Sequence, residues 1–419
     1  MGLMSPVMRE ALRARDPYPN DLLALDFAGV ATGGRQFYKR EGIIVPRFEM
    51  LSGALSTGHA GFGTQQVNTA WRGFPANAPL IGDGGLGVWE ARTNQFARSL
   101  DFSNAVWSVP SGATKTLAAD VVAPNGLSSC FVLKAANTAF GGYLRQGVTY
   151  SGSTTYALSF IVKKKNHRYV GLRMEKGVLG VPEAIPFYDF DTDALSNNGV
   201  SGASISRELL PNGWVRLSLV YTTSASPTTA ADLWLTNSLG QTGPALSGTE
   251  EIYVWHGQVE AGAFASPPIF TEATAATRTA VAQSVGGLVL PSGDFDIEQT
   301  FRLGPSGVTS RAFEYHNGTD AERILCNVST GGSLSAFVVV GGGSATQIGA
   351  SSSPLAPGAE ARVSVRRRGS NWQFIVNEAQ SGGDTAAGAP SVNAVIFGQR
   401  RINTEVLNST IQRHRVRAA

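Results

Sequence analysis

The sequence is poor in charge and in cysteine. Lys, Arg, Asp and Glu make up 16% of its 419 residues, against roughly a quarter in an average soluble protein. Its 34 basic and 31 acidic residues nearly cancel, so we expect no nucleic-acid partner. Its two cysteines, Cys130 and Cys326, lie far apart and outside any CxxC or Cys/His zinc spacing. We therefore expect two free thiols and neither a disulfide framework nor a zinc site.

Long hydrophobic runs are also lacking. AFVVV at 336–340 is among the longest, far short of the roughly 18 residues that a membrane-spanning helix needs. The first 17 residues contain no apolar core of a signal peptide. We therefore expect a chain that is made in the bacterial cytoplasm without a signal peptide and does not insert into a membrane.

Catalytic signatures are missing as well. The sequence contains no GxSxG elbow, HExxH pair, P-loop or Rossmann fingerprint, so we predict no enzyme, no catalytic residues and no cofactor. Polysaccharide hydrolysis needs only two carboxylates roughly 5–10 Å apart. A depolymerase therefore stays open as an alternative.

Short alternating segments between turn residues are what the sequence does contain. Glycine is abundant, at 49 residues, and Asn-Gly turns separate the apolar runs. Alternation with a period of two places one set of apolar residues on a single strand face: Tyr156, Leu158, Phe160 and Val162 in TYALSFIVKKK, and Val215, Leu217 and Leu219 in WVRLSLVY. The pattern predicts an all-β jelly-roll-like sandwich over 96–275.

A second β-sandwich is predicted over 286–419, after a small polar linker at 271–285. FDIEQTFRL alternates apolar residues from Phe295 to Leu303. In the segment after it, Val363 and Val365 precede a turn at Arg366–Gly369, and Trp372, Phe374 and Val376 follow. Alternation on both sides of a turn predicts a β-hairpin.

The N-terminal region, 1–95, lacks such a pattern and is predicted to be a mostly irregular anchor. Apolar residues at helical spacing between Val7 and Leu12 predict one short helix that ends before Pro17. So short a helix is marginal alone. We interpret it either as a segment that docks onto a partner or as a frayed tail.

The stretch IYVWHGQVEAGAFASPPIF at 252–270 reads as one strand that ends at a proline pair. Strict alternation places Tyr253 and Trp255 on one face and His256 on the other. The stretch is either the last strand of the first sandwich or part of a ligand-binding wall.

Acidic residues alternate in YDFDTDALSNNG, where Asp189, Asp191 and Asp193 resemble the start of a calcium loop. Ala194 and Val200 occupy the positions where an EF-type loop needs Gly and Glu. We therefore predict a turn and no metal site.

Carbohydrate-binding candidates come from the exposed basic and aromatic residues. Basic runs at strand ends would attract an anionic polysaccharide, although charges there also protect sheet edges. Aromatic and histidine side chains beside them would contact sugar rings. The predicted residues are His256, Tyr169, Lys163, Lys165, Arg366 and Arg368.

LGVWEARTNQFARSLDFSNAVWSV at 86–109 resembles a segment of tailed-phage fibre and spike proteins. Further matches to that family follow in order at Tyr156–Lys164, Asn212–Arg216 and Tyr253–Arg278, together spanning about 190 residues. The family usually has Gly where this chain has His256. More weakly, WQFIVNE and LNSTIQRHRV resemble a concanavalin A-like or laminin G-like sandwich. The same proteins occur on phage-derived gene-transfer particles.

The resemblance implies a fibre or head-spike protein on the surface of a virion or phage-like particle. Its sandwiches would bind host-surface polysaccharide, either capsule or lipopolysaccharide, and its N-terminal region would dock to other virion proteins. Homo-oligomers are expected, trimers by analogy with phage fibres. A capsule depolymerase and a purely structural decoration protein are the alternatives.

Overall fold

The computed structural model describes most of the chain from residue 87 onward, and eight short strands before that point. Of the first 86 residues it describes only the backbone of those strands. The predicted N-terminal helix at 1–20 lies outside the described residues. Beyond residue 86, the residues left undescribed are 110–111, 127–129, 139–141, 175–184, 224–227, 242–245, 281–282, 287–288, 305–308, 401–405 and 419.

The fold is all-β, as the sequence predicts. The described residues contain one helical element, the 3₁₀ turn η2 (Pro211–Gly213), and otherwise strands and their connections. No helix in this part of the chain has the length and hydrophobicity to cross a membrane. The chain divides into two compact units, one of Arg92–Arg278 with Thr69–Arg72, the other of Thr279–Ala419 with Met1–Asn68 and Gly73–Ala91.

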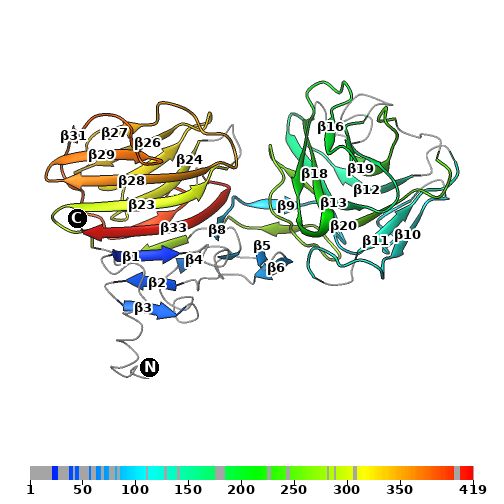
Figure 1. Ribbon diagram of the computed structural model, residues 1–419, viewed down its shortest axis with the longest axis horizontal. Coiled ribbons are helices and arrows are strands. Elements are labelled where there is room, and N and C mark those ends of the chain that lie inside the picture. The colour runs from blue at the N-terminus through cyan, green and yellow to red at the C-terminus, as the bar shows by residue number, and fades with distance from the viewer. Residues whose placement is uncertain are drawn as a thin grey trace. The chain divides into compact units, whose positions relative to one another are not determined.

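The first unit is a sandwich of two antiparallel sheets (Figure 1), here called the first sandwich. Its six-strand sheet has the order β10 (Thr114–Leu117), β11 (Phe131–Lys134), β20 (Glu251–Ala261), β13 (Thr155–Lys164), β18 (Trp214–Thr222), β17 (Ser204–Leu209). Its five-strand sheet has the order β12 (Tyr143–Thr149), β19 (Thr228–Leu235), β14 (Tyr169–Met174), β15 (Phe187–Asp189), β16 (Ala194–Ser196). A two-strand ribbon joins β9 (Arg92–Asn94) to β21 (Ala276–Arg278).

Alternation decides which side of the six-strand sheet faces the core. Successive side chains of a strand point to opposite faces, and the predicted inward residues of β13 and β18 all lie in one buried cluster: Tyr156, Leu158, Phe160, Val162, Val215, Leu217 and Leu219. Both strand predictions are therefore confirmed. The side of this sheet that faces away from the core is called the outer face below.

The second unit, here called the second sandwich, also packs two sheets around a buried core. In its eleven-strand sheet the main order is β3 (Ile43–Pro46), β2 (Phe37–Arg40), β1 (Asp21–Asp26), β33 (Ser409–Ala418), β23 (Phe295–Arg302), β28 (Glu360–Arg368), β29 (Asn371–Val376), β30 (Ala379–Gln380), with β31 (Thr385–Ala386), β7 (Ile81–Gly82) and β8 (Gly85–Val88) off this path. Its seven-strand sheet has the order β27 (Thr346–Ala350), β26 (Leu334–Val339), β25 (Arg323–Val328), β24 (Ser310–His316), β32 (Ala394–Phe397), β22 (Gln283–Gly286), β4 (Ser56–Thr57).

The predicted hairpin of the second sandwich is confirmed. Strands β28 and β29 pair in antiparallel register, with Arg368 opposite Asn371 across a two-residue turn. Phe295, Ile297, Phe301 and Leu303 face the core together, as alternation along FDIEQTFRL predicts.

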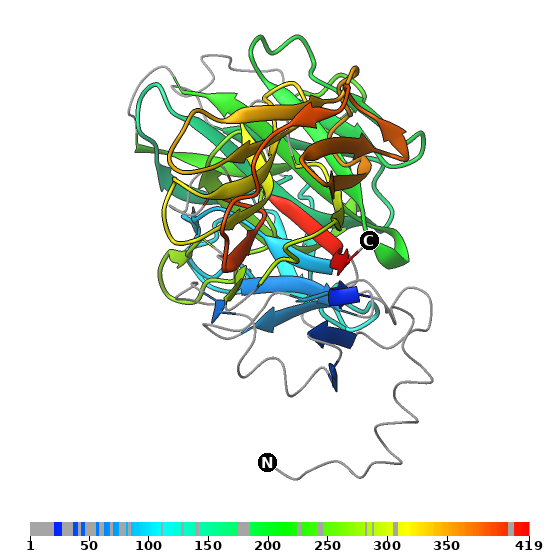
Figure 2. The same ribbon diagram turned by 90° about the vertical axis from the view of Figure 1, so that its left-hand side faces the viewer.

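Strands of the N-terminal region pair with the strands of this sandwich. β1 pairs with the C-terminal strand β33, and β2 and β3 continue the same sheet (Figure 1, Figure 2). A further short pair joins β5 (Gly63–Val67) to β6 (Ala70–Phe74). The sequence pattern did not indicate these strands, because they are short and lack clear alternation.

Candidate functional site

Residues 262–271, which follow β20, fold back over the outer face and form what is called the strap below. Glu260 fixes its middle: Ser266 donates from its backbone N to one carboxylate oxygen and from its hydroxyl to the other, both at 2.7 Å. The Ile269 backbone N donates to Gln258 Oε1 at 2.7 Å. The chain therefore leaves the sandwich through a segment bound to the strand that it has just completed.

Asn94 and Arg278 hold the strap from the β9–β21 ribbon. The Asn94 amide is fully buried and donates to the carbonyl oxygens of Gly257 at 3.2 Å and Ile269 at 2.9 Å. Arg278 is also fully buried and donates to the Pro267 carbonyl oxygen at 3.1 Å. Both residues lie in segments that resemble phage-fibre proteins, and here both have a structural role in holding the strap.

Gly262 starts the strap because no other residue fits there. Its φ is +143°, and a Cβ at this position would lie 1.1 Å from Arg92 Nη1. The Arg92 guanidinium donates to the Ala261 carbonyl oxygen and lies 4.6 Å from the centre of the Phe264 ring. Such a cation–π contact orients Phe264.

Trp255 and His256 share the outer face, which corrects the prediction of opposite faces. A β-bulge causes this: Ile161 pairs with His256 and Val162 with Val254, so Trp255 is the extra residue. Both side chains are fully buried, and both rings contact Phe270 of the strap, at 5.7 and 5.6 Å between centroids. As a candidate sugar contact, His256 is therefore inaccessible in this structure.

A groove of ≈ 320 Å³ opens on the outer face beside the strap. This volume lies at the lower end of the range for ligand pockets, roughly 300–1,000 Å³. The floor comes from β17 and β18 and the wall from the strap, with the lining residues Ser204, Ser206, Arg207, Glu208, Arg216, Ser218, Val220, Ala263, Phe264 and Ala265.

Strand register explains the polar floor. Ser206 lies opposite Ser218, and Glu208 lies opposite Arg216. These residues alternate with Leu217 and Leu219 of the core, so they point outward. Because β17 is the edge strand of its sheet, the groove has an open side along it. Hydroxyl, carboxylate and guanidinium groups beside one aromatic ring are the groups with which proteins hold polar ligands.

Arg216 is the buried charge of this groove, with 3% of its surface exposed. Its Nη2 donates to Ser159 Oγ at 3.2 Å and to the Ser266 carbonyl oxygen. Its Nε is buried and has no acceptor in the part of the chain that the structure describes. Burial lowers the pKa of Arg216, against the opposing effects of Glu208 and Glu260.

Lys163, Lys165 and Tyr169 lie in the first sandwich but away from the groove lining. Lys165 forms an ion pair with Glu251 at 3.1 Å and lies 5.3 Å from the Tyr253 ring. Lys163 is half-buried near the same end of β13. Tyr169 begins β14 in the five-strand sheet, with the Arg168 guanidinium 5.0 Å from its ring.

Arg366 and Arg368 belong to the second sandwich and meet around Asp296. The carboxylate of this nearly buried aspartate lies 2.7 Å from Arg368, 3.8 Å from Arg366 and 3.3 Å from Arg417. The six predicted residues thus fall in two separate units, and none of them lines the groove.

The predicted turn at YDFDTDALSNNG is confirmed. It joins β15 to β16 in a hairpin. Asp189 accepts hydrogen bonds from Arg168 at 2.7 and 2.8 Å and from Thr192 at 2.7 Å. Asp193, at φ +55°, accepts from Arg207 and from the Tyr188 hydroxyl. These carboxylates thus accept hydrogen bonds from neighbouring arginines and hydroxyls.

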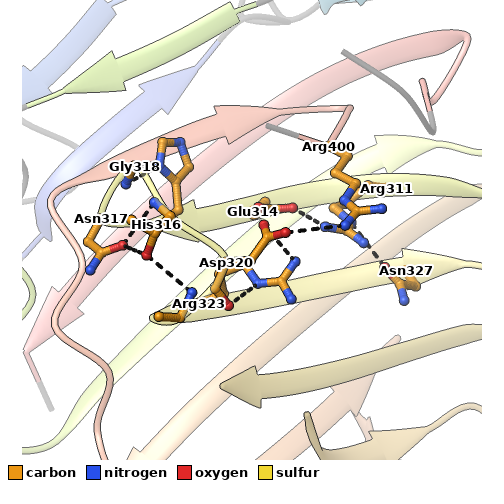
Figure 3. A network of polar contacts seen from close by, with 11 residues as sticks. Arg311, Glu314, His316, Asn317, Gly318, Asp320, Arg323, Asn327 and Arg400 are labelled. Atoms are coloured by element: carbon orange, nitrogen blue, oxygen red, sulfur yellow. Dashed lines mark hydrogen bonds and ion pairs between the residues drawn. The ribbon is translucent and has the colours of Figure 1, made fainter. Parts of the chain in front are cut away.

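A second polar cluster lies on strands β24 and β25 of the second sandwich (Figure 3). Glu314 has no exposed surface and pairs with Arg311, which also donates to Asn327 at 3.1 Å. Beside them, Asp320 lies 3.4 Å from Arg323 and 3.5 Å from Arg400. Each of these charged side chains thus forms an ion pair within the cluster. The described residues contain no group of His, Cys, Asp and Glu that could hold a metal ion.

Sequence reasoning missed the groove because its lining mixes small residues with charged ones that resemble ordinary exposed strand positions. The signal was present in WVRLSLVY, where Arg216 and Ser218 occupy the alternate positions between core residues. A strand whose outward positions are polar but not all exposed indicates a covered outer face. The covering strap, however, is fixed by long-range hydrogen bonds that no local pattern shows.

No protein-family model and no curated protein matches the sequence. Among solved structures, the chain is similar to the tandem CBM22 modules of Paenibacillus barcinonensis Xyn10C, at 10% identity and a TM-score of 0.26, covering 80% of this chain and 99% of that one. It is also similar to domains LG4-5 of the mouse laminin α1 chain, at 12% identity and a TM-score of 0.24, covering 72% and 90%. A third match is the carbohydrate-binding module CBM66 of Bacillus subtilis, at 12% identity and a TM-score of 0.25, covering 33% and 82%. Likenesses this low leave the ligand of this chain unassigned.

Proposed function

We propose that the chain is a non-enzymatic fibre or spike protein of a phage or phage-derived particle that binds host-surface polysaccharide. The groove on the outer face of the first sandwich is the observation that carries the proposal. It offers hydroxyl, carboxylate and guanidinium groups along a floor of two strands, next to the ring of Phe264. Sugars carry many hydroxyls around a partly apolar ring, so this set of groups fits them.

The carboxylate content of the groove favours binding over hydrolysis. Among the described lining residues, Glu208 is the one carboxylate. Glycoside hydrolysis uses a pair of them. Glu260 lies nearby, but Ser266 and Gln258 occupy its oxygens beneath the strap.

Many copies on one particle would turn a weak groove into firm adhesion. Linked sites raise the effective concentration of the second contact, so avidity exceeds the single-site affinity by about 10²–10⁴. A homo-oligomer, a trimer by analogy with phage fibres, would provide this, and the N-terminal region would hold it on the virion surface.

Blocking the groove tests the binding site directly. Ser206→Trp places a large side chain on the floor of the groove, from an exposed position on an edge strand. Ser201→Trp, at an exposed turn of the same sandwich outside the lining, is the matched control. On an array of bacterial capsular polysaccharides and lipopolysaccharides, the parent and Ser201→Trp proteins should bind and Ser206→Trp should not. Equal binding by all three would move the site elsewhere, and no binding by the parent protein would refute the proposal.

The particle role needs a separate test. Particles assembled with a chain lacking residues 1–20 should lose the protein, while the purified truncated chain stays folded. Normal incorporation would refute an attachment role for that segment. Particles without the protein should adsorb to host cells less well, and unchanged adsorption would favour the purely structural alternative.

A further inference from the structure

We propose that the groove selects an acidic glycan and that a sugar carboxylate pairs with Arg216. This inference rests on the proposed function and names the class of sugar. The starting observation is that Arg216 lines the groove and is 3% exposed, yet no carboxylate of the described residues lies within ion-pair distance of it.

A buried cation without a carboxylate partner is an unfavourable arrangement. Removing a guanidinium from water carries a large desolvation cost, which an adjacent opposite charge normally offsets. Among the described residues, Arg216 has a hydroxyl and a carbonyl as acceptors, and its Nε has none. Folding thus leaves part of the hydrogen-bonding capacity of this guanidinium unused.

The neighbouring carboxylates do not neutralise Arg216 in the structure. Glu260 lies under the strap, where its two oxygens accept from Ser266 and Gln258. Glu208 lies across from Arg216 on the edge strand, exposed and without a hydrogen bond or ion pair among the described residues. The two act on Arg216 only at longer range.

A carboxylate on the ligand would supply what the fold does not. Arg pairs with carboxylates through two parallel N–H···O bonds, and such pairs are strongest in sites shielded from water. The serines of the floor, at 204, 206 and 218, would then accept from or donate to the sugar hydroxyls. Phosphate or sulfate substituents share this chemistry with carboxylates, and the probes below separate them.

Glu208 makes the proposal sharply testable. Its negative charge disfavours an anionic ligand that reaches Arg216 relative to a neutral one. Because Glu208 is exposed and its side chain makes no hydrogen bond or ion pair among the described residues, Glu208→Gln should leave the fold intact. Arg216 itself anchors the strap through Ser266, so Arg216→Gln is informative only alongside a melting curve.

The experiment measures binding of the full chain to capsular polysaccharides presented in two forms. One form is native and contains uronic acids, and in the other those carboxyls have been reduced to primary alcohols. We expect the native form to bind at least tenfold more tightly, with an affinity that falls as salt rises. Glu208→Gln should raise the ratio of native-form to reduced-form affinity about threefold to tenfold, because it removes a charge that repels the sugar carboxylate.

Each other outcome has a distinct meaning. Equal binding of the native and reduced forms would overturn the inference and leave the proposed function standing. Tighter binding of glycans that carry sulfate or phosphate but no uronic acid, compared with the native polysaccharide, would overturn the carboxylate assignment. A ratio of native-form to reduced-form affinity that Glu208→Gln leaves unchanged or lowers would overturn the charge argument. No binding by any glycan would refute the proposed function and the inference together.

Discussion

Trp255 and His256 are consecutive in the sequence, yet their rings lie on the same face of β20, with centroids 5.9 Å apart. The bulge that brings them together also puts both against Phe270 of the strap. The pair therefore ties the final strand of the first sandwich to the segment that covers it. Its role is in packing, because both rings lie against the strap.

Trp255→Ala should destabilise the first sandwich by about 3–5 kcal/mol, the usual cost of truncating a buried aromatic. Trp255 is fully buried between Phe270 and the outer-face cluster that contains Trp214 and Ile161. Denaturant unfolding followed by fluorescence measures the loss. Val122→Ala, at a position 54% exposed, serves as the control and should change stability little. A neutral result for Trp255→Ala would contradict its place in the core.

Stability should fall on acidification because two histidines are buried in the neutral form. Burial, with the charge of Arg216 nearby, lowers the pKa of His256 to about 3. Burial likewise lowers the pKa of His414 to about 3. Between pH 6.5 and pH 3 these histidines bind protons in the unfolded chain but not in the folded chain. The stability of the fold is therefore greatest above pH 6.5 and decreases as pH falls toward 3.

The lowered pKa of each histidine should reduce the free energy of unfolding by about 2 kcal/mol at pH 5 relative to pH 8. His256→Gly should lower stability at pH 8 because it leaves space beside Trp255. It should also flatten the pH dependence between pH 8 and pH 5. Urea unfolding of both proteins at the two pH values tests this, and parallel losses in parent and variant would show that His256 does not titrate as described.

Local alternation predicted much of this fold, and long-range contacts explain what it missed. The inward residues of β13, β18 and β28 follow from a period of two alone. The bulge at Trp255 breaks that period by one residue, and it reversed the assignment of His256. The strap followed from no pattern, because it depends on Asn94, which lies 175 residues from Ile269 in the sequence.

Asn94→Ala should cost about 2–4 kcal/mol and loosen the strap, because it removes four hydrogen bonds of a fully buried amide. Its Nδ2 donates to two carbonyl oxygens, and its Oδ1 accepts from the backbone N of Phe96 and of Val259. Hydrogen exchange should show faster exchange at residues 266–271 than in the parent protein. Thr93→Ala on the exposed side of the same strand is the matched control. Unchanged protection of the strap in Asn94→Ala would disprove the anchoring role.

Glu298→Gln should destabilise the second sandwich by about 1–3 kcal/mol at pH 7. The carboxylate is nearly buried, 2.8 Å from Arg362 and 2.9 Å from Arg415. Burial alone would raise the pKa of Glu298, but hydrogen bonds from both arginines bring the net pKa below its ordinary value. Its contribution is therefore present above about pH 4.5 and is lost as pH falls through the lower folded pKa. The gap between variant and parent should narrow at pH 3, and a gap independent of pH would exclude the ion pairs as its cause.

The two thiols should report on the two sandwiches separately. Cys130 and Cys326 are free and fully buried, as the sequence predicts. Burial raises the pKa of Cys130 to about 11 and that of Cys326 to about 12. Since the thiolate is the reactive form, a thiol reagent at pH 8 should label neither in the folded protein and both in denaturant, without any reductant.

Cys130 belongs to the same buried cluster as Trp255, whereas Cys326 lies in the core of the second sandwich. Trp255→Ala should therefore speed the labelling of Cys130 by one or more orders of magnitude and leave Cys326 protected, because local opening exposes only the sandwich that has lost its packing. Equal acceleration at both cysteines would mean that the two sandwiches unfold as one unit.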